Sequence, residues 1–535
     1  MKNILKVEFE DKYLGAFLGA VVGDAIGWPQ EDRSMRIGKN FKPKPQFQKW
    51  YRRSGNKYLP HEEVIDPGSY SDDTQLLIAT ARSLENKNWF SHFVKVELPT
   101  WLLYERGGGG ATKRAADLWS NGHPPWKLEK QKKADIKRYF EAGGNGVTMR
   151  ILPHVFNSFA NPSEISHQVF LNGIATHGHP KALLSAILYS KALEYQIKKE
   201  DVLAYGELIE YLLKERDEWS NFPDLNNLED WKESANFFTS GNYMKIWEET
   251  SVELIEGLYI IKNALNQGLM DKTHQTLTRL NCFDSKIRGA GTVACLVAIY
   301  IASKYASDPV RGLLEISFLE NTDSDTNASM VGGLLGSIHG TEWIIPEWYE
   351  VQDYDYLCKL VQNLKKEKSN NNPTLWHWSE KNKFKRLLPS IGIGDKLILN
   401  TFGEIELVKK INHKPLTKNI EPVTYKFLSS QGQSLYIKLV NKIEKNNIHT
   451  KIVPVKNNKR IVFEEDDLEK LIDLIPPRIT AKKTFSIILD LIQNIDNLDT
   501  KNESEIKAYA SKFIRKGYEL DLIVNLIKGI KEKRN

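Results

Sequence analysis

The sequence of 535 residues predicts a multidomain protein in which an all-α domain is followed by a small β-rich module and a helical C-terminal segment. Three observations support this fold class. The chain is longer than a typical single domain of about 100 to 200 residues. Apolar residues recur at helical spacing from about residue 8 to residue 360, and near residue 365 the composition changes to short runs of β-forming residues.

The helical region is predicted from apolar residues three and four positions apart, in stretches separated by Gly, Pro and Asn. These stretches are residues 74–84, 181–195, 253–267, 291–304 and 327–339. Residues 292–301 are apolar on nearly every side, which predicts a helix buried in the middle of a large bundle.

The last third of the chain is divided by composition. The polar stretch 365–373, KKEKSNNNP, is typical of a linker. The β-forming runs are residues 396–399, 404–408, 423–428, 435–439 and 452–455, and helical periodicity returns at 467–474, 481–495 and 520–530. We therefore expect an all-α domain over 1–362, a linker over 363–390, a β-rich module over 391–462 and a helical segment over 463–535.

The formal net charge of +6 is concentrated in one region. Residues 381–460 carry 17 Lys and Arg against 5 Asp and Glu, residues 461–535 carry 13 against 14, and the first 380 residues carry 44 against 49. Aromatic residues are interleaved with the lysines of this basic segment: Phe384, Phe402, Tyr425, Phe427 and Tyr436. Exposed rings and lysines would make nucleic acid a candidate partner, whereas buried rings would be the core of a solvated module.

Composition excludes several classes of protein. Hydrophobic residues at 41% and charged residues at 27% exclude wholesale disorder. The three cysteines are an odd number and lack the spacing of a metal site, so we expect neither a disulfide framework nor a zinc site. We expect a cytoplasmic location, where cysteines stay reduced. The sequence contains no uninterrupted apolar run of about 18 residues, so we expect no membrane partner. The glycine-containing stretch 14–28 is unlike a secretion signal.

Two acidic clusters each precede an apolar helix: YSDDT at residues 70–74 and NTDSDT at residues 321–326. Each could simply cap its helix, because Ser, Thr and Asp accept backbone hydrogen bonds there. Capping needs one acceptor, however, and two adjacent carboxylates repel each other. Carboxylate and hydroxyl oxygens suit Mg²⁺ or Mn²⁺, so the clusters also predict a site for a pair of divalent ions.

Three further motifs are candidates for site residues. In GDAIGWPQE, residues 23–31, we expect Pro29 to end a helix and to place Glu31 on a loop. In GGNGVTMR, residues 143–150, backbone N–H groups could cradle a phosphate, although Gly-Asn-Gly is also an ordinary turn. In THGHP, residues 176–180, a histidine pair before a helix is more often structural than catalytic.

Together with GGGGATKRAA at residues 107–116, these motifs occur in an order that resembles the ADP-ribosylglycohydrolase family, which includes the dinitrogenase reductase-activating glycohydrolases. The resemblance covers about residues 12–345. It implies an orthogonal all-α domain with two Mg²⁺ or Mn²⁺ ions at the mouth of a cleft. The implied metal ligands are Ser71, Asp72, Asp73, Asp323, Asp325 and Thr326. The implied substrate-binding residues are Gly144, Asn145, Gly146, Val147 and His179, with Glu31 as the mobile glutamate over the ribose.

The resemblance implies a metal-dependent hydrolase that removes ADP-ribose from a modified protein side chain or nucleic acid, by cleaving the bond at the ribose anomeric carbon. Glu31 and Asp72 are the candidates for proton transfer. The alternative is a non-catalytic protein that binds ADP-ribose or neutralises a toxin. Three departures from the family pattern bear on substrate choice: Ser71 in place of Thr, Val147 in place of a smaller residue and Asn321 in place of Gly.

Overall fold

The computed structural model describes residues 9–36, 43–127, 131–159, 161–223 and 228–442. Residues 1–445 form one compact unit and residues 446–535 a second, and every element given below belongs to the first. The predicted strand at 452–455 and the predicted helical segment 463–535 lie outside the described residues. The domain boundaries at 362, 390 and 462 stay predictions.

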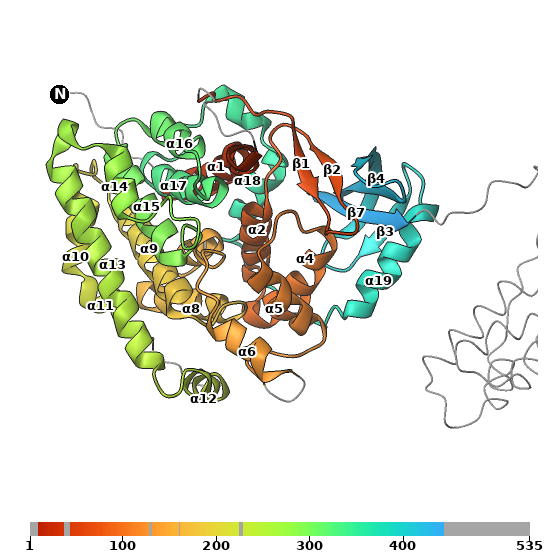
Figure 1. The fold of residues 1–535 in the computed structure, drawn as a ribbon, viewed down its shortest axis with the longest axis horizontal. Coiled ribbons are helices and arrows are strands. Elements are labelled where there is room, and N and C mark those ends of the chain that lie inside the picture. Colours follow the sequence, from red (N-terminus) through yellow and green to blue (C-terminus); the bar gives the residue numbers. More distant parts are fainter. Residues whose placement is uncertain (1–8, 37–42, 128–130, 160, 224–227, 443–535) are drawn as a thin grey trace, which may run out of the picture. The chain divides into compact units, whose positions relative to one another are not determined.

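Helices make up most of the described chain (Figure 1). They are α1 (Phe9–Arg36), α2 (Asp72–Leu84), α3 (Trp89–His92), α4 (Leu98–Tyr104), α5 (Gly110–Ser120), α6 (Lys133–Phe140), α7 (Leu152–Asn157), α8 (Ile165–Ile174), α9 (Pro180–Lys198), α10 (Glu207–Lys214), α11 (Arg216–Ser220), α12 (Glu229–Phe238), α13 (Tyr243–Asn266), α14 (Thr273–Arg279), α15 (Gly291–Lys304), α16 (Pro309–Ser317), α17 (Ser324–His339), α18 (Tyr354–Asn363) and α19 (Trp378–Leu387). A π-helical turn, η1 (Phe93–Glu97), joins α3 to α4, and a 3₁₀ turn, η3 (Thr148–Arg150), precedes α7. None of the described helices is long and apolar enough to cross a membrane.

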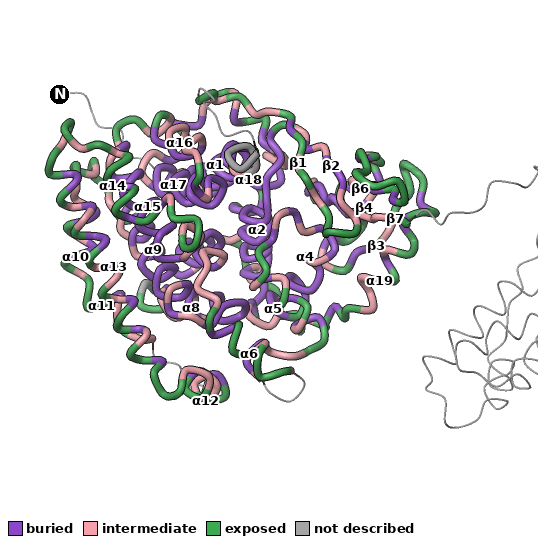
Figure 2. Tube along the Cα trace, viewed as in Figure 1, coloured by how far each residue is buried: buried purple, intermediate pink, exposed green. Residues whose placement is uncertain are grey.

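The core of the unit contains the helix that the sequence predicts to be buried on all sides. In α15, every residue from Gly291 to Ser303 is buried. The burial map shows the same for α2 and for most of the neighbouring α9 and α17, while α10 to α14 are exposed on their outer sides (Figure 2). The prediction of a buried helix over 292–301 is therefore confirmed.

Helices α1 and α17 are in direct backbone contact along their lengths. A Cβ atom built on any of four glycines of α1 would lie 1.8 to 2.3 Å from a backbone oxygen of α17 or of Gly340, which follows it. The four are Gly15, Gly19, Gly23 and Gly27. Because only glycine permits this approach, the stripe fixes the register of the two helices and brings the second half of α1 beside the start of α17.

The prediction that Pro29 ends a helix is wrong, because α1 continues through Pro29 to Arg36. A proline inside a helix removes one backbone hydrogen bond and costs about 3 kcal/mol. Contacts with α17 offset this cost, and one of them is the hydrogen bond of 3.0 Å from Ser324 Oγ to the carbonyl of Gly27. Glu31 therefore lies on a helix whose position is fixed by its neighbour, and not on a loop.

Two antiparallel sheets lie beside the helices, with α19 next to them (Figure 1). The larger sheet has the order β3 (Lys396–Leu399), β4 (Gly403–Asn412), β6 (Ile420–Ser429) and β7 (Ser434–Lys442), which confirms four of the predicted β-forming runs. The smaller sheet pairs β1 (Trp50–Ser54) with β2 (His61–Ile65), and β2 with the short β5 (Lys414–Pro415).

The hairpin β1–β2 corrects the prediction that residues 1–362 are all helical. In β2 the buried face consists of His61, Glu63 and Ile65. Two of these three side chains are polar or charged, so the alternation of apolar residues that reveals a half-buried strand is absent. Since β5 pairs with β2, the β-rich region extends a sheet of the helical region.

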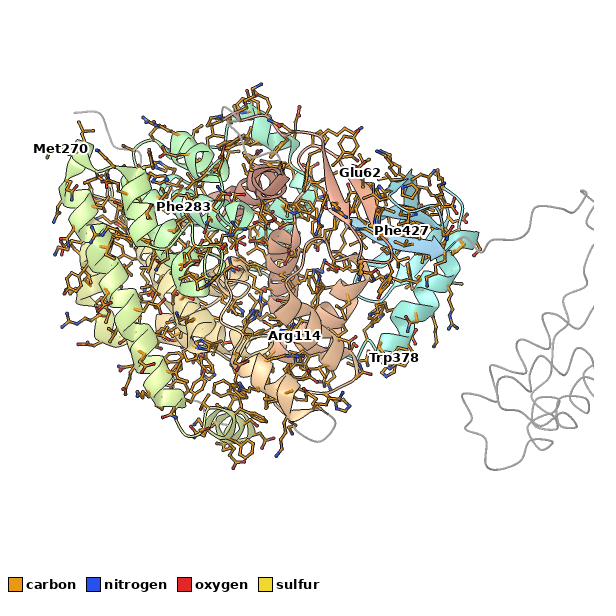
Figure 3. All side chains as sticks on the ribbon, in the orientation of Figure 1. Glu62, Arg114, Met270, Phe283, Trp378 and Phe427 are labelled. Atoms are coloured by element: carbon orange, nitrogen blue, oxygen red, sulfur yellow. The ribbon has the colours of Figure 1, made fainter. Side chains whose placement is uncertain are left out.

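The interleaved aromatic rings of the basic segment are core residues. Phe384, Phe402, Tyr425, Phe427 and Tyr436 are exposed by 8, 2, 4, 0 and 6%, respectively. Figure 3 shows Phe427 within the sheet. The interpretation in which the rings fill the module is confirmed, and the one in which they stack on nucleic acid bases is wrong. Their spacing along strands fits both, and only the way in which the sheet packs on its neighbours decides between them.

Candidate functional site

The first acidic cluster forms the N-terminus of α2. Ser71 is the N-cap residue, and its Oγ accepts a hydrogen bond of 3.1 Å from the backbone N–H of Asp73. Asp72 and Asp73 form the first turn and are both buried. The capping interpretation thus accounts for Ser71 but leaves the two carboxylates without a structural role at the helix end.

Asp24 of α1 holds this helix end in place, although the sequence analysis did not single it out. Its carboxylate accepts hydrogen bonds from the backbone N–H groups of Ser71 and Thr74 at 3.0 Å and from Thr74 Oγ1 at 2.6 Å. Asp24 is fully buried. A carboxylate within the apolar, glycine-containing stretch 14–28 is a signal that could have identified it, because such a group requires nearby donors.

The second acidic cluster forms the N-terminus of α17, with Asp323 at the N-cap position and Asp325 and Thr326 in the first turn. Carboxylate oxygens of Asp323, Asp325 and Glu31 all lie within 4.8 Å of one another. The structure therefore brings Glu31 together with the second cluster, from the helix that packs against α17.

The two clusters face each other. The side chain of Thr326 hydrogen-bonds to Asp73, and the charges of Asp24, Asp72 and Asp323 act on the same carboxylate. Burial and these neighbouring carboxylates raise the pKa of Asp73. For Asp325, burial and then Glu31 and Asp73 raise the pKa, and for Asp72, burial and then Glu105 raise it to about 8.

The donor set is suited to hard divalent cations. Asp73 Oδ1 is buried and has no hydrogen-bond partner among the described residues. Acidic side chains that are buried together, with an oxygen left unpartnered, require positive charge to be stable as carboxylates. Oxygen ligands of this kind are those that Mg²⁺ and Mn²⁺ prefer.

The turn at residues 143–147 lies against the second cluster. Asn145 Nδ2 donates a hydrogen bond of 2.8 Å to Asp323 Oδ2. Its backbone N–H donates to the carbonyl of Gly289 at 3.0 Å, and Gly144 forms an isolated bridge with Ala290. The pairing with residues 289–290 thus holds the turn beside the second acidic cluster. This turn contains the predicted residues Gly144, Asn145 and Gly146.

Val147 and His179, the other two predicted substrate-binding residues, have structural contacts of their own. Val147 is fully buried, and its side chain packs in the core beside Gly173. His179 is the N-cap residue of α9, with Nδ1 accepting from the backbone N–H of Lys181 at 3.0 Å. Both histidines lie against the turn: a Cβ on Gly143 would be 3.3 Å from His179 Nδ1, and a Cβ on Gly146 would be 3.2 Å from His177 Cε1.

The segment before α5 closes the other side of the site. Gly107 has φ +105°, and a Cβ there would lie 2.9 Å from Asp72 Oδ1. Gln75 Oε1 fixes this segment by accepting from the backbone N–H of Arg106 at 3.1 Å and from Trp101 Nε1 at 3.0 Å. The first glycine of the GGGG motif is therefore required for close approach to Asp72.

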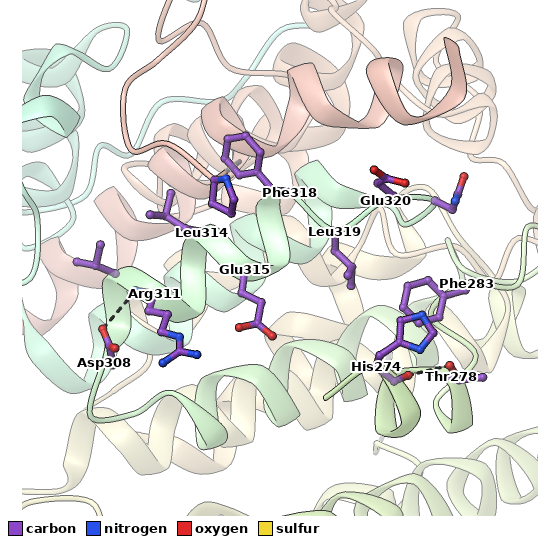
Figure 4. Close-up of a pocket in the computed structure, with 13 residues that line it drawn as sticks. His274, Thr278, Phe283, Asp308, Arg311, Leu314, Glu315, Phe318, Leu319 and Glu320 are labelled. Atoms are coloured by element: carbon purple, nitrogen blue, oxygen red, sulfur yellow. Dashed lines mark hydrogen bonds between the residues drawn. The ribbon is translucent and has the colours of Figure 1, made fainter. Parts of the chain in front are cut away.

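A cavity of about 1040 Å³ lies between α14, α16 and the segment that leads into α17 (Figure 4). It is lined by His274, Phe283, Arg311 and Glu315, among others, and by none of the predicted site residues. Asn321, at its edge, has φ +60°. Asn tolerates this left-handed conformation better than most residues, which explains how it can stand where the family pattern has glycine.

The chain is similar to known ADP-ribosylglycohydrolases in sequence. The sequence profile of the ADP-ribosylglycohydrolase family matches residues 5–374. The chain is 26% identical over 203 residues to the ADP-ribosyl-[dinitrogen reductase] glycohydrolase of Rhodospirillum rubrum; the match covers 35% of this chain and 58% of that protein. A solved structure described as an ADP-ribosylglycohydrolase-related protein complex aligns with a TM-score of 0.42 at 19% identity, covering 68% of this chain and 99% of that one.

Proposed function

The chain belongs to the ADP-ribosylglycohydrolase family, as its motifs predict, and on that premise we propose that it is a metal-dependent hydrolase that removes ADP-ribose from a modified target. The bond cleaved is the one at the anomeric carbon of the ribose. The convergence of Glu31, Asp323 and Asp325 within 4.8 Å is the observation that supports this proposal most directly.

In this proposal two divalent ions, Mg²⁺ or Mn²⁺, are held between the N-termini of α2 and α17. The ligands are Ser71, Asp72, Asp73, Asp323, Asp325 and Thr326. Such ions, when bound, act as Lewis acids toward the ribose hydroxyls and water. Asp24 holds α2 in register, and the α1–α17 contact holds the two clusters opposite each other.

Glu31 and Asp72 carry the proton transfers. Glu31 is half-buried and reaches the second cluster from α1, and Asp72 lies against the Gly107 turn on the opposite side. An attacking water between them would give its proton to one of these carboxylates. In this proposal the turn of Asn145 and Gly146, whose Asn145 donates to Asp323, binds the diphosphate and the distal ribose.

The proposed target is an ADP-ribosylated macromolecule. The curated relative acts, by its name, on ADP-ribosyl-[dinitrogen reductase], which is a protein. We also propose a salt-dependent contact between nucleic acid phosphates and exposed lysines of residues 381–460, such as Lys409, Lys410 and Lys414. This contact would involve no base stacking.

The deciding experiment offers ADP-ribosylated arginine, serine, DNA and RNA to the protein with Mg²⁺ or Mn²⁺ and measures released ADP-ribose. The proposal expects release with at least one substrate and loss of release when the metal is chelated. Stoichiometric binding of ADP-ribose without any release would instead support the alternative of a non-catalytic binding or toxin-neutralising protein.

A further inference from the structure

Two arginine side chains lie near the ring of Trp28 on the Asp72 side of the site. The guanidinium carbon of Arg52, from β1, is 5.5 Å from the centre of the Trp28 ring, and that of Arg106 is 5.3 Å from it. Arg106 also lies 4.2 Å from the centre of the Tyr436 ring of β7. The aromatic rings thus hold two cations near Asp72.

Arg106 has donors without acceptors. Its side chain is 4% exposed, and neither Nε nor Nη1 has a hydrogen-bond partner among the described residues. A buried guanidinium normally finds carboxylate or carbonyl oxygens, because unpaired buried donors are costly. The unpartnered nitrogens therefore indicate a group that the chain itself does not supply.

Two nearby carboxylates, Glu63 and Glu105, have lysine partners. Glu63 Oε2 lies 2.5 Å from Lys438 Nζ, and Glu105 Oε1 lies 3.7 Å from Lys113 Nζ. A further cation, Lys385, is near both Glu105 and Lys438. Arg52, Arg106 and Lys385 form no ion pair among the described residues, although the charges of Arg52 and Arg106 act on Glu63 and that of Arg52 acts on Asp72.

Arg106 and the Asn145 turn lie by different acidic clusters. Asn145 contacts Asp323, whereas Gly107, next to Arg106 in the chain, contacts Asp72. Under the proposed function, the diphosphate half of the substrate lies along the Asn145 turn. The group from which ADP-ribose is released then lies on the Asp72 side, in front of the arginines.

We propose, resting on the proposed function, that Arg52 and Arg106 bind the acceptor group, and that this acceptor is a phosphate joined through oxygen to the ribose anomeric carbon. Guanidinium groups match phosphate oxygens in pairs, and a neutral hydroxyl acceptor would leave them unpaired. A cationic acceptor such as arginine would be repelled by both.

The chemistry of this acceptor balances without a further reactant. The oxygen of water bonds to the anomeric carbon as the bond from that carbon to the phosphate oxygen breaks. The electron pair of the broken bond leaves with the phosphate, while one proton of the water passes to an active-site carboxylate. Arg52 and Arg106 stabilise the charge that develops on the departing phosphate.

The test compares ADP-ribose 1″-phosphate with serine-linked and arginine-linked ADP-ribose. We expect the wild-type protein to prefer the phosphate-linked substrate. Arg52→Met and Arg106→Met should each lower its kcat/KM by about tenfold or more, with changes within about twofold for the serine-linked substrate. Arg53→Met is the matched control, since Arg53 is the exposed neighbour of Arg52 in β1. An oligonucleotide carrying ADP-ribose on a terminal phosphate then tests nucleic acid as the source of the acceptor.

Preference for the arginine-linked substrate, or equal losses on all substrates, would overturn this inference while leaving the hydrolase intact. Failure of the wild-type protein to cleave any substrate would instead count against the proposed function. In that case titration of inorganic phosphate by calorimetry still tests the anion site, which should weaken in Arg52→Met. Arg106→Lys, which keeps the charge, provides a second variant if Arg106→Met does not fold.

Discussion

Thr74 Oγ1 donates a hydrogen bond of 2.6 Å to Asp24 Oδ2, which joins the first turn of α2 to the middle of α1. Asp24 also accepts from two backbone N–H groups of the same turn. A single buried carboxylate therefore sets the position of Asp72 and Asp73 relative to the helix that carries Glu31.

Replacing Asp24 by Asn should destabilise the protein and reduce metal binding. The amide of Asn has one acceptor oxygen, and its NH₂ group would face donors, so some of these N–H groups would lose their partner. We expect a loss of about 1 to 3 kcal/mol in the free energy of unfolding, measured by denaturant titration, together with reduced metal content.

Asp11→Asn is the matched control for Asp24→Asn. Asp11 also lies on α1 and accepts from Thr341, through the backbone N–H at 2.9 Å and the hydroxyl at 2.5 Å. Its loss should lower stability without changing metal content. Equal loss of metal in both variants would show that Asp24 acts on the site only through global stability.

Metal binding should stabilise the protein, and the stabilisation should depend on both acidic clusters. Ligand at one hundred times its dissociation constant adds about 2.7 kcal/mol to the free energy of unfolding. Asp72→Ala and Asp325→Ala should each remove the increase in melting temperature that Mg²⁺ or Mn²⁺ produces, and should abolish hydrolysis. Asp217→Ala, at a side chain 92% exposed, is the control. Unchanged release of ADP-ribose in both cluster variants would contradict the dinuclear site.

Glu31→Gln should separate proton transfer from metal binding. The amide keeps the shape of the side chain but cannot accept a proton at neutral pH, so we expect a fall in kcat of about 10² or more. Metal content, measured by elemental analysis, should be unchanged. Because Glu31 lies within 4.8 Å of Asp323 and Asp325, loss of metal is the informative contrary result and would make Glu31 a ligand.

Much of the site was predictable from sequence because its chemistry resides in short motifs at helix N-termini. A helix start is indicated by both acidic motifs, Ser71 to Asp73 and Asp323 to Thr326. Capping preferences place these residues at the helix N-terminus whatever the tertiary fold. The contact of Asn145 with Asp323 could not be read in the same way, because the two residues are 178 positions apart and meet only through the pairing of residues 144 and 290.

The errors have a common physical origin, which is that tertiary packing overrides local preference. Pro29 would end an isolated helix, but α1 is held against α17 by its glycine stripe. Strand β2 escapes prediction because Glu63 occupies its buried face, and the compensating charge, Lys438, lies 375 residues further along the chain. Arg106 was likewise not singled out, since its two aromatic neighbours, Trp28 and Tyr436, come from opposite ends of the described chain.

The ion pair between Glu63 and Lys438 should make stability depend on pH in the acid range. Burial raises the pKa of Glu63, but Lys438, Arg106 and Arg52 outweigh it and lower the value to about 2, below the ordinary 4.5. The unfolded chain therefore takes up this proton first as pH falls. The stabilising contribution of the Glu63 carboxylate is fully present above pH 4.5 and is lost progressively between about 4.5 and 2. Glu63→Gln should be less stable at pH 7, and its free energy of unfolding should fall less steeply as the pH is lowered.

Glu62→Gln should resemble the wild type, because Glu62 faces Lys414 at the partly exposed edge (Figure 3). If the free energy of unfolding falls equally with pH in the wild type and in Glu63→Gln, the contact between β2 and β7 does not depend on this charge.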